Sequence, residues 1–182
     1  MENFSEGIRT TKYFGNVELE YDSDPDLCGC VSFWTILNGQ GILVSIYDYN
    51  NMGNKINLCW EIIDKYYEIT KIAKNAIIEN FQDKTGTVNH YFKYNFDKIK
   101  EKNYGENIID IFGVNDFEKI NIQKIMEEIS YPCLTFHFKD SVFSVSIDFT
   151  IIENARIEDD VILCVLMDKK LKVIGYEIYY EL

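Results

Sequence analysis

The chain begins with hydrophobic and polar positions that alternate, and this pattern predicts β-strands. In residues 17–21 the apolar or aromatic side chains Val17, Leu19 and Tyr21 alternate with the acids Glu18 and Glu20, which is typical of a strand with one buried and one solvated face. Two apolar runs follow, over residues 30–37 and 42–47, and Asn38-Gly39 lies between them. Because Asn-Gly between apolar runs favours a two-residue hairpin turn, we predict a three-stranded antiparallel meander here.

From about residue 56 the apolar positions recur every three or four residues, which predicts amphipathic helices. One apolar stripe covers residues 56–80 and a second covers residues 88–99. Gly86 lies between the two stripes and Gly105 follows the second, where glycines commonly end helices. We therefore predict a helical hairpin, followed by a short helix over residues 122–129.

The period of two returns after Pro132. Four strands are predicted, over residues 134–139, 143–149, 161–167 and 171–180. Three strands, then helices, then four strands is not the alternation that builds parallel βαβ units. We therefore predict a single α+β domain over residues 1–182: a mainly antiparallel sheet of about six or seven strands, three N-terminal and four C-terminal, with the central helical hairpin packed on one face.

The two periodicities also predict which side chains meet. The apolar faces of the strands and helices are expected to form one continuous core between sheet and helices. Its predicted members are Val17, Leu19, Phe33, Val44, Ile46, Ile63, Tyr66, Ile77, Phe92, Phe136, Phe138, Phe143, Val145, Ile147 and Leu163.

Charge is distributed unevenly along the chain, whose net charge is −12. No lysine or arginine lies between Lys12 and Lys55. The first predicted strand and the turn after it carry a set of acids, which we predict to be an exposed surface for a basic protein partner. These acids are Glu18, Glu20, Asp22, Asp24 and Asp26.

The same charge disfavours nucleic acid as a partner, and the chain has only two arginines, Arg9 and Arg156. No run approaches the ~18 consecutive apolar residues that a membrane span needs. The first residues lack the basic and apolar character of a signal peptide. We therefore expect a cytoplasmic protein whose five cysteines stay reduced.

Two short motifs have some features of metal or redox sites. Residues 22–26 resemble the opening of a calcium loop, but Leu27 and Phe33 stand where such a loop has glycine and glutamate. Cys28 and Cys30 lack the second pair of ligands that zinc needs, so we interpret them as structural, with a redox pair as the alternative. Neither a metal nor a cofactor is predicted.

His137 and Ser144 are the best catalytic candidates. If residues 140–141 form a two-residue loop, His137 faces Ser144 across the hairpin, and a histidine beside a hydroxyl is the start of a nucleophile and base pair. No nucleophile elbow or glycine-rich oxyanion loop accompanies them, and Asp148 lies too far along the strand to orient the imidazole. We interpret the pair as a cross-strand hydrogen bond and assign no catalytic residue.

Several short motifs carry a family resemblance. Lys12-Tyr13-Phe14-Gly15 before an acidic strand, the Asn38-Gly39 turn, the amphipathic helical hairpin and a closing strand pair around Asp168 resemble uncharacterised bacterial proteins of the immunity-protein kind. The resemblance covers most of the chain. It implies a small, soluble, cytoplasmic α+β protein without known catalytic residues, whose relatives often look like toxin antidotes.

Charge and resemblance lead to one hypothesis with two alternatives. The hypothesis is a non-enzymatic binding protein that neutralises a basic toxin, such as a nuclease, by occupying its substrate groove. The first alternative is a structural or regulatory domain whose acidity serves solubility. The second is a hydrolase that uses His137 and Ser144.

Overall fold

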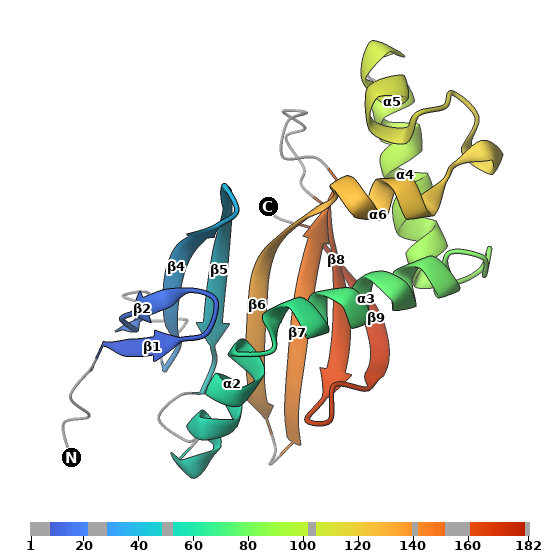
Figure 1. Ribbon diagram of the computed structural model, residues 1–182. Helices are drawn as coiled ribbons and strands as arrows, with labels where there is room; N and C mark the ends of the chain where they lie inside the picture. The colour runs from blue at the N-terminus through green and yellow to red at the C-terminus, as the bar shows by residue number, and fades with distance from the viewer. Residues whose placement is uncertain are drawn as a thin grey trace.

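The fold is α+β, in a computed structural model that describes residues 8–21, 29–48, 53–101, 105–139, 142–151 and 161–180. Its main sheet has seven strands in the order β3-β4-β5-β6-β7-β8-β9 (Figure 1). These are β3 (Glu20–Tyr21), β4 (Val31–Leu37), β5 (Gln40–Ile46), β6 (Ser130–Lys139), β7 (Val142–Thr150), β8 (Val161–Asp168) and β9 (Val173–Tyr180).

The described helices all lie between β5 and β6 in the chain. They are α2 (Ile56–Ile63), α3 (Tyr66–Asn80), α4 (Thr87–Glu101), α5 (Gly105–Phe112) and α6 (Ile122–Glu128), with short 3-10 helices at Gly53–Lys55 and Phe117–Lys119. Figure 1 shows α2, α3 and α6 in front of the sheet. The helix predicted over residues 122–129 is therefore confirmed as α6.

Most neighbouring strands of the main sheet pair antiparallel, as predicted, but β5 and β6 pair parallel. This one parallel pair was not predicted, because the whole helical segment acts as one crossover connection, which parallel neighbours require. A single crossover leaves no repeated βαβ alternation in the sequence. The turn at Asn38-Gly39 was predicted correctly, and both residues have the positive φ (54° and 84°) of a tight hairpin turn.

The first predicted strand, over residues 17–21, is wrong as a single strand. Val17 ends β2 (Gly15–Val17), which pairs with β1 (Arg9–Thr11) in a separate two-stranded sheet, and the chain then enters β3. The small hairpin is held by its own apolar contacts: the Phe14 ring lies 5.9 Å from Phe33 and 5.1 Å from Tyr66. Because Phe14 packs against the core, β2 belongs to the small hairpin, and the predicted strand is interrupted between β2 and β3.

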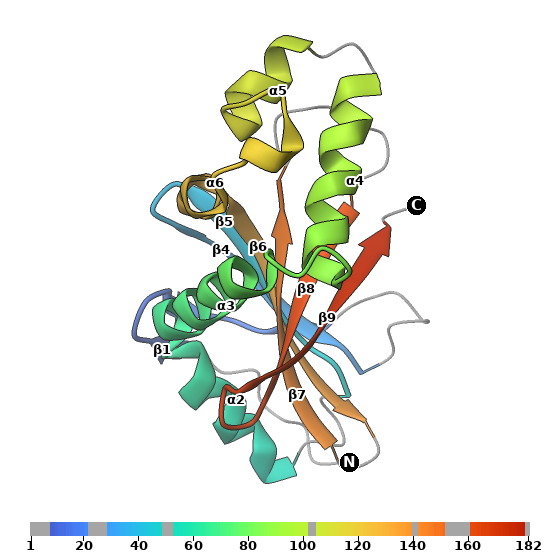
Figure 2. The same ribbon diagram turned by 90° about the vertical axis from the view of Figure 1, so that its right-hand side faces the viewer.

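The helical hairpin also differs from the prediction. The stripe over residues 56–80 is divided into α2 and α3 at Asp64 and Lys65, where the Asp64 carboxylate accepts a hydrogen bond of 2.7 Å from the backbone N–H of Lys12. Gly105 starts α5 instead of ending the preceding helix. Figures 1 and 2 show that α4 turns away from α3, so the two are not laid side by side as an antiparallel pair.

The predicted core is largely correct. Its members belong to one cluster of buried side chains between the sheet and the helices. Leu19, Phe138 and Phe143 are only half-buried at the margin of that cluster. The Lys55 ammonium lies 3.3 Å from the centroid of the Phe138 ring, which explains how that margin tolerates a charged neighbour.

Tyr91 of α4 joins helix and sheet, and we expect its hydroxyl to matter for stability. The hydroxyl is buried, donates to the carbonyl of Phe149 (3.1 Å) and accepts from the N–H of Ile151 (3.2 Å). Changing Tyr91→Phe leaves both backbone groups without that partner, so the free energy of unfolding should fall by about 1–3 kcal/mol. Urea denaturation at constant m-value measures it, and an unchanged midpoint would contradict this role.

Candidate binding surface

Strand register divides the side chains of the main sheet between two faces. One face packs on the helices and includes Phe33, Val44, Leu134 and Ile147. We call the opposite one the outer face, and among the described residues no helix packs on it. Two rows cross it from strand to strand: Glu20, Ser32, Ser45, Thr135, Ser146 and Leu166, and then Trp34, Leu43, Cys133, Asp148, Cys164 and Glu177.

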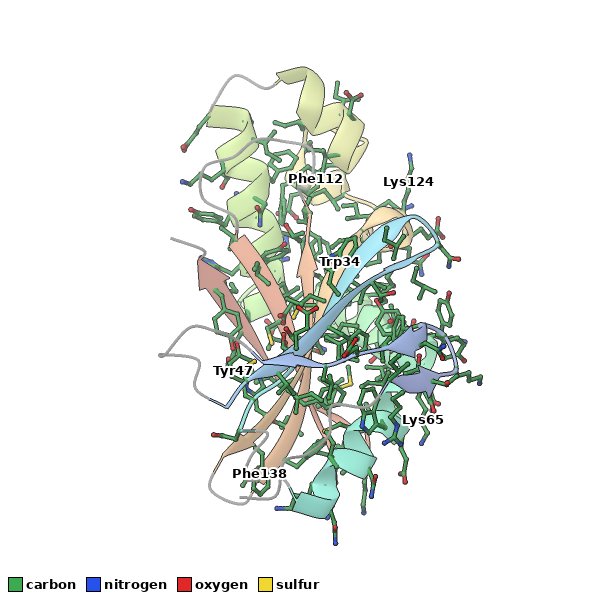
Figure 3. The ribbon with its side chains drawn as sticks, turned by 90° about the vertical axis from the view of Figure 1, so that its left-hand side faces the viewer. Trp34, Tyr47, Lys65, Phe112, Lys124 and Phe138 are labelled. Carbon is green, nitrogen blue, oxygen red and sulfur yellow. The ribbon has the colours of Figure 1, made fainter. Side chains whose placement is uncertain are left out.

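The outer face of β4 and β5 carries an exposed apolar patch, formed by Trp34, Ile36 and Leu43. Trp34 is 65% exposed and faces Leu43 across the two strands, and Ile36 is 61% exposed. Gly41 lets the indole lie close to the backbone, because a Cβ there would come within 3.1 Å of Trp34 Cζ2. Figure 3 shows Trp34 on this ribbon, with Tyr47 towards its other end.

One described acid, Glu20, borders the apolar patch. Glu20 is exposed and pairs in register with Ser32, two residues before Trp34 on the same face. Such diagonal neighbours lie about 7–8 Å apart. Glu18 is also exposed, in the link between β2 and β3. The other three predicted partner-binding acids, Asp22, Asp24 and Asp26, lie outside the described residues.

A row of alternating thiols and carboxylates crosses the centre of the outer face. Cys133, Asp148, Cys164 and Glu177 are cross-strand neighbours on β6, β7, β8 and β9. Burial, reinforced by the negative charge of Asp148, raises the pKa of the Cys133 thiol to about 12, and the pKa of Cys164 rises for the same reasons. Tyr179 donates a hydrogen bond to the Glu177 carboxylate, and burial followed by that bond raises its pKa.

The thiolate, and not the protonated thiol, is the nucleophile and the metal ligand. Because their raised pKa values keep Cys133 and Cys164 protonated near neutral pH, this row is unsuited to thiol chemistry. Cys59, the thiol in α2, is also buried, and burial raises its pKa to about 12. The described part of the chain holds no group of three or more His, Cys, Asp or Glu side chains placed to bind a metal ion. Cys30 is buried next to the start of β4, and its predicted companion Cys28 lies outside the described residues.

His137 and Ser144 are placed opposite each other across β6 and β7, as the predicted hairpin loop required. The expected hydrogen bond is absent from the bonds among described residues. The imidazole instead stacks on Tyr47, with ring centroids 5.1 Å apart and planes at 7°. Burial lowers the pKa of His137, although the nearby charges of Glu177 and Asp48 oppose that shift. The ring is therefore held by an aromatic contact from Tyr47, the residue that follows β5.

Sequence reasoning missed the apolar patch and the thiol and carboxylate row. Residues 31–37 hold apolar side chains on both faces, Val31 and Phe33 on one and Trp34 and Ile36 on the other. That two-sided pattern was the available signal of an exposed apolar surface. The row had no sequence signal, since it depends on the order of four strands.

Comparisons of the chain with family models, curated proteins and solved structures find no match. Of the helices described, none has both the length and the apolar character needed to cross a membrane. Functional inference for this chain therefore depends on its own geometry and charge.

The raised thiol pKa values predict slow alkylation in the native state. At pH 8 a thiol whose pKa is about 12 instead of 9 has about a thousandfold smaller thiolate fraction. Cys133 is the most informative case because it is only half-buried, so access alone does not protect it. Mass spectrometry after iodoacetamide treatment should show Cys133 modified at least about a hundredfold faster in denaturant than in native protein. Equal rates of alkylation in native and denatured protein would contradict a raised pKa for Cys133.

The lowered pKa of His137 predicts a pH dependence of stability. At pH values below 6.5, the usual pKa of histidine, His137 binds a proton more readily in the unfolded chain than in the native state. The free energy of unfolding should therefore fall as pH is lowered from 6.5 towards the folded-state pKa, and this contribution is fully present above 6.5. Urea denaturation of the wild type and His137→Gln across this window isolates the effect, because both share all other titrations. Parallel pH profiles would contradict it.

Proposed function

We propose that this chain is a non-enzymatic binding protein that recognises a basic protein partner through its outer face, in the manner of an immunity protein that neutralises a toxin such as a nuclease. The observation that carries the proposal is the apolar patch of Trp34, Ile36 and Leu43 beside the exposed acid Glu20. Exposed apolar surface rimmed by polar residues marks interaction sites.

The two parts of this surface suit different steps of binding. Tryptophan is enriched among the residues that dominate interface energies, and Trp34 sits on a rigid strand pair with its indole over Gly41. The acids would act earlier, because complementary charge speeds the encounter of partners and excludes partners of like charge. The described side chains on the outer face of the sheet include the acids Glu20, Asp148 and Glu177, while one lysine, Lys139, holds an outer register position at the end of β6.

Binding fits the geometry better than hydrolysis does. A serine nucleophile needs its hydroxyl bonded to a base that a third group orients. The His137 ring is stacked on Tyr47, and the described hydrogen bonds do not link it to Ser144. The thiols on this face are held in their protonated state by burial and by Asp148. These features favour a recognition surface over a reactive one.

A capture experiment tests the proposal. Immobilised wild-type protein is incubated with lysate of the source cell at low and high salt, and retained proteins are identified by mass spectrometry. We expect a basic protein that wild type retains at low salt and that Trp34→Ala does not retain. Ile109→Ala, which alters an apolar residue of similar exposure on α5, should retain it. A protein retained equally by both variants would place the interaction elsewhere.

A further inference from the structure

The far edge of the main sheet is a long strand, β9, with no described strand on its outer side. Among the described residues β9 pairs only with β8. Figure 2 views the molecule from the side where β9 forms this edge, and no helix is drawn across the lower part of the strand. An unpaired edge presents a row of backbone N–H and C=O groups to another strand, and natural proteins usually blunt such edges.

This edge is only partly blunted. A register shift at Ile174 breaks the pairing between β8 and β9 near the start of the strand and leaves that side chain 58% exposed. From Gly175 to Tyr180 the register is regular and contains neither proline nor lysine. Exposed apolar area is present there as well, since Tyr179 is 44% exposed.

The edge is also rigid. The Tyr176 hydroxyl donates to the carbonyl of Ala76 (3.2 Å) and accepts from the side-chain amide of Asn80 (2.6 Å). These bonds fasten β9 to α3 from the helix-covered side of the sheet. A strand that is already fixed loses little conformational entropy when another strand pairs with it, so more of the pairing energy remains as affinity.

The charges along the edge are arranged so that two antiparallel copies of it bring opposite charges together. Exposed lysines precede β9 at positions 169, 170 and 172, while the exposed acid Glu177 lies in its second half. Two copies related by a two-fold axis perpendicular to the sheet pair their edge strands antiparallel. The basic end of each strand then lies near the acidic part of the other.

We propose that the partner of this edge is a second copy of the chain, and that two molecules join through antiparallel β9 strands into one continuous sheet. One strand pair buries less surface than the roughly 1,200 Å² of a stable interface. The dimer is therefore concentration-dependent. Both outer faces end on the same side of the joined sheet, with their Trp34 patches at its two far ends.

Sedimentation equilibrium of the wild type from about 1 to 500 µM tests this directly. The mass should rise with concentration from 21.4 kDa towards twice that value. Ile174→Lys places a hydrated charge on the edge itself, as natural sheets do to prevent edge pairing, and should weaken dimerisation at least tenfold. Val142→Lys is the matched control, since Val142 is 63% exposed at the start of β7, and it should dimerise as wild type does.

Hydrogen exchange of wild-type protein supplies a readout that needs no variant. Alternate amides of β9 point away from β8, and their exchange should slow as concentration rises. A wild type that stays monomeric throughout the range would overturn the proposal. So would a dimer whose β9 amides exchange at the same rate as in the monomer.

Discussion

Replacing Trp34 by alanine is expected to weaken binding of the basic partner about a hundredfold, or about 2.7 kcal/mol. The indole is the largest exposed apolar side chain of the outer face, and it faces Leu43 over Gly41. Because it is mostly exposed, its loss should change the free energy of unfolding by less than about 1 kcal/mol. Titration calorimetry with the purified partner gives the affinity, and urea denaturation gives the stability.

Ile109→Ala provides the control for that measurement. Ile109 is 55% exposed on α5, so its truncation removes exposed apolar surface from a different part of the molecule. Its affinity should stay within about twofold of wild type. If Trp34→Ala also binds within twofold while remaining folded, the apolar patch is not part of the interface.

Phe136→Ala should produce the largest loss of stability, about 3–5 kcal/mol. Phe136 is fully buried in β6, between Ile46 on β5 and Val145 on β7, and its ring lies 6.2 Å from Phe143. Truncation removes apolar contact and leaves a cavity where the sheet meets the helices. Such a loss is a large share of the stability of an ordinary domain.

Equilibrium urea denaturation measures the effect of Phe136→Ala. Val142→Ala, at an exposed site on β7, should change the free energy of unfolding by less than about 0.5 kcal/mol. If Phe136→Ala lowers the free energy of unfolding by less than about 1 kcal/mol, β6 is not central to the core.

Local patterns predicted the parts of the fold that depend on near neighbours. The hairpin at Asn38-Gly39 and the facing of His137 and Ser144 follow from turn chemistry and the period of two. The parallel pairing of β5 with β6 joins residues about ninety positions apart, as Val44 and Leu134 show, and no local pattern encodes it. The β1–β2 hairpin was missed because its strands span only three residues each and are mostly polar.

The candidate site was predictable only in part. Charge identified Glu18 and Glu20 as exposed acids, because no lysine or arginine lies nearby in the sequence. Trp34 was missed, since a tryptophan in an apolar run is usually buried and only the register shows it on the outer face. Cys133 and Cys164 lie in mostly apolar strand segments, and their common neighbour Asp148 emerges only from strand order.

The central claim is that a basic partner docks on the acidic outer face, and the association rate as a function of salt tests it most directly. Stopped-flow mixing measures the rate at which the captured partner associates with wild type and with a variant. In the variant the corresponding amides, Gln or Asn, replace Glu18, Glu20, Asp22, Asp24 and Asp26. We expect the variant to fold normally but to associate at least about tenfold more slowly at low salt, with a shallower dependence on ionic strength. An unchanged rate and an unchanged salt slope would contradict recognition through this surface.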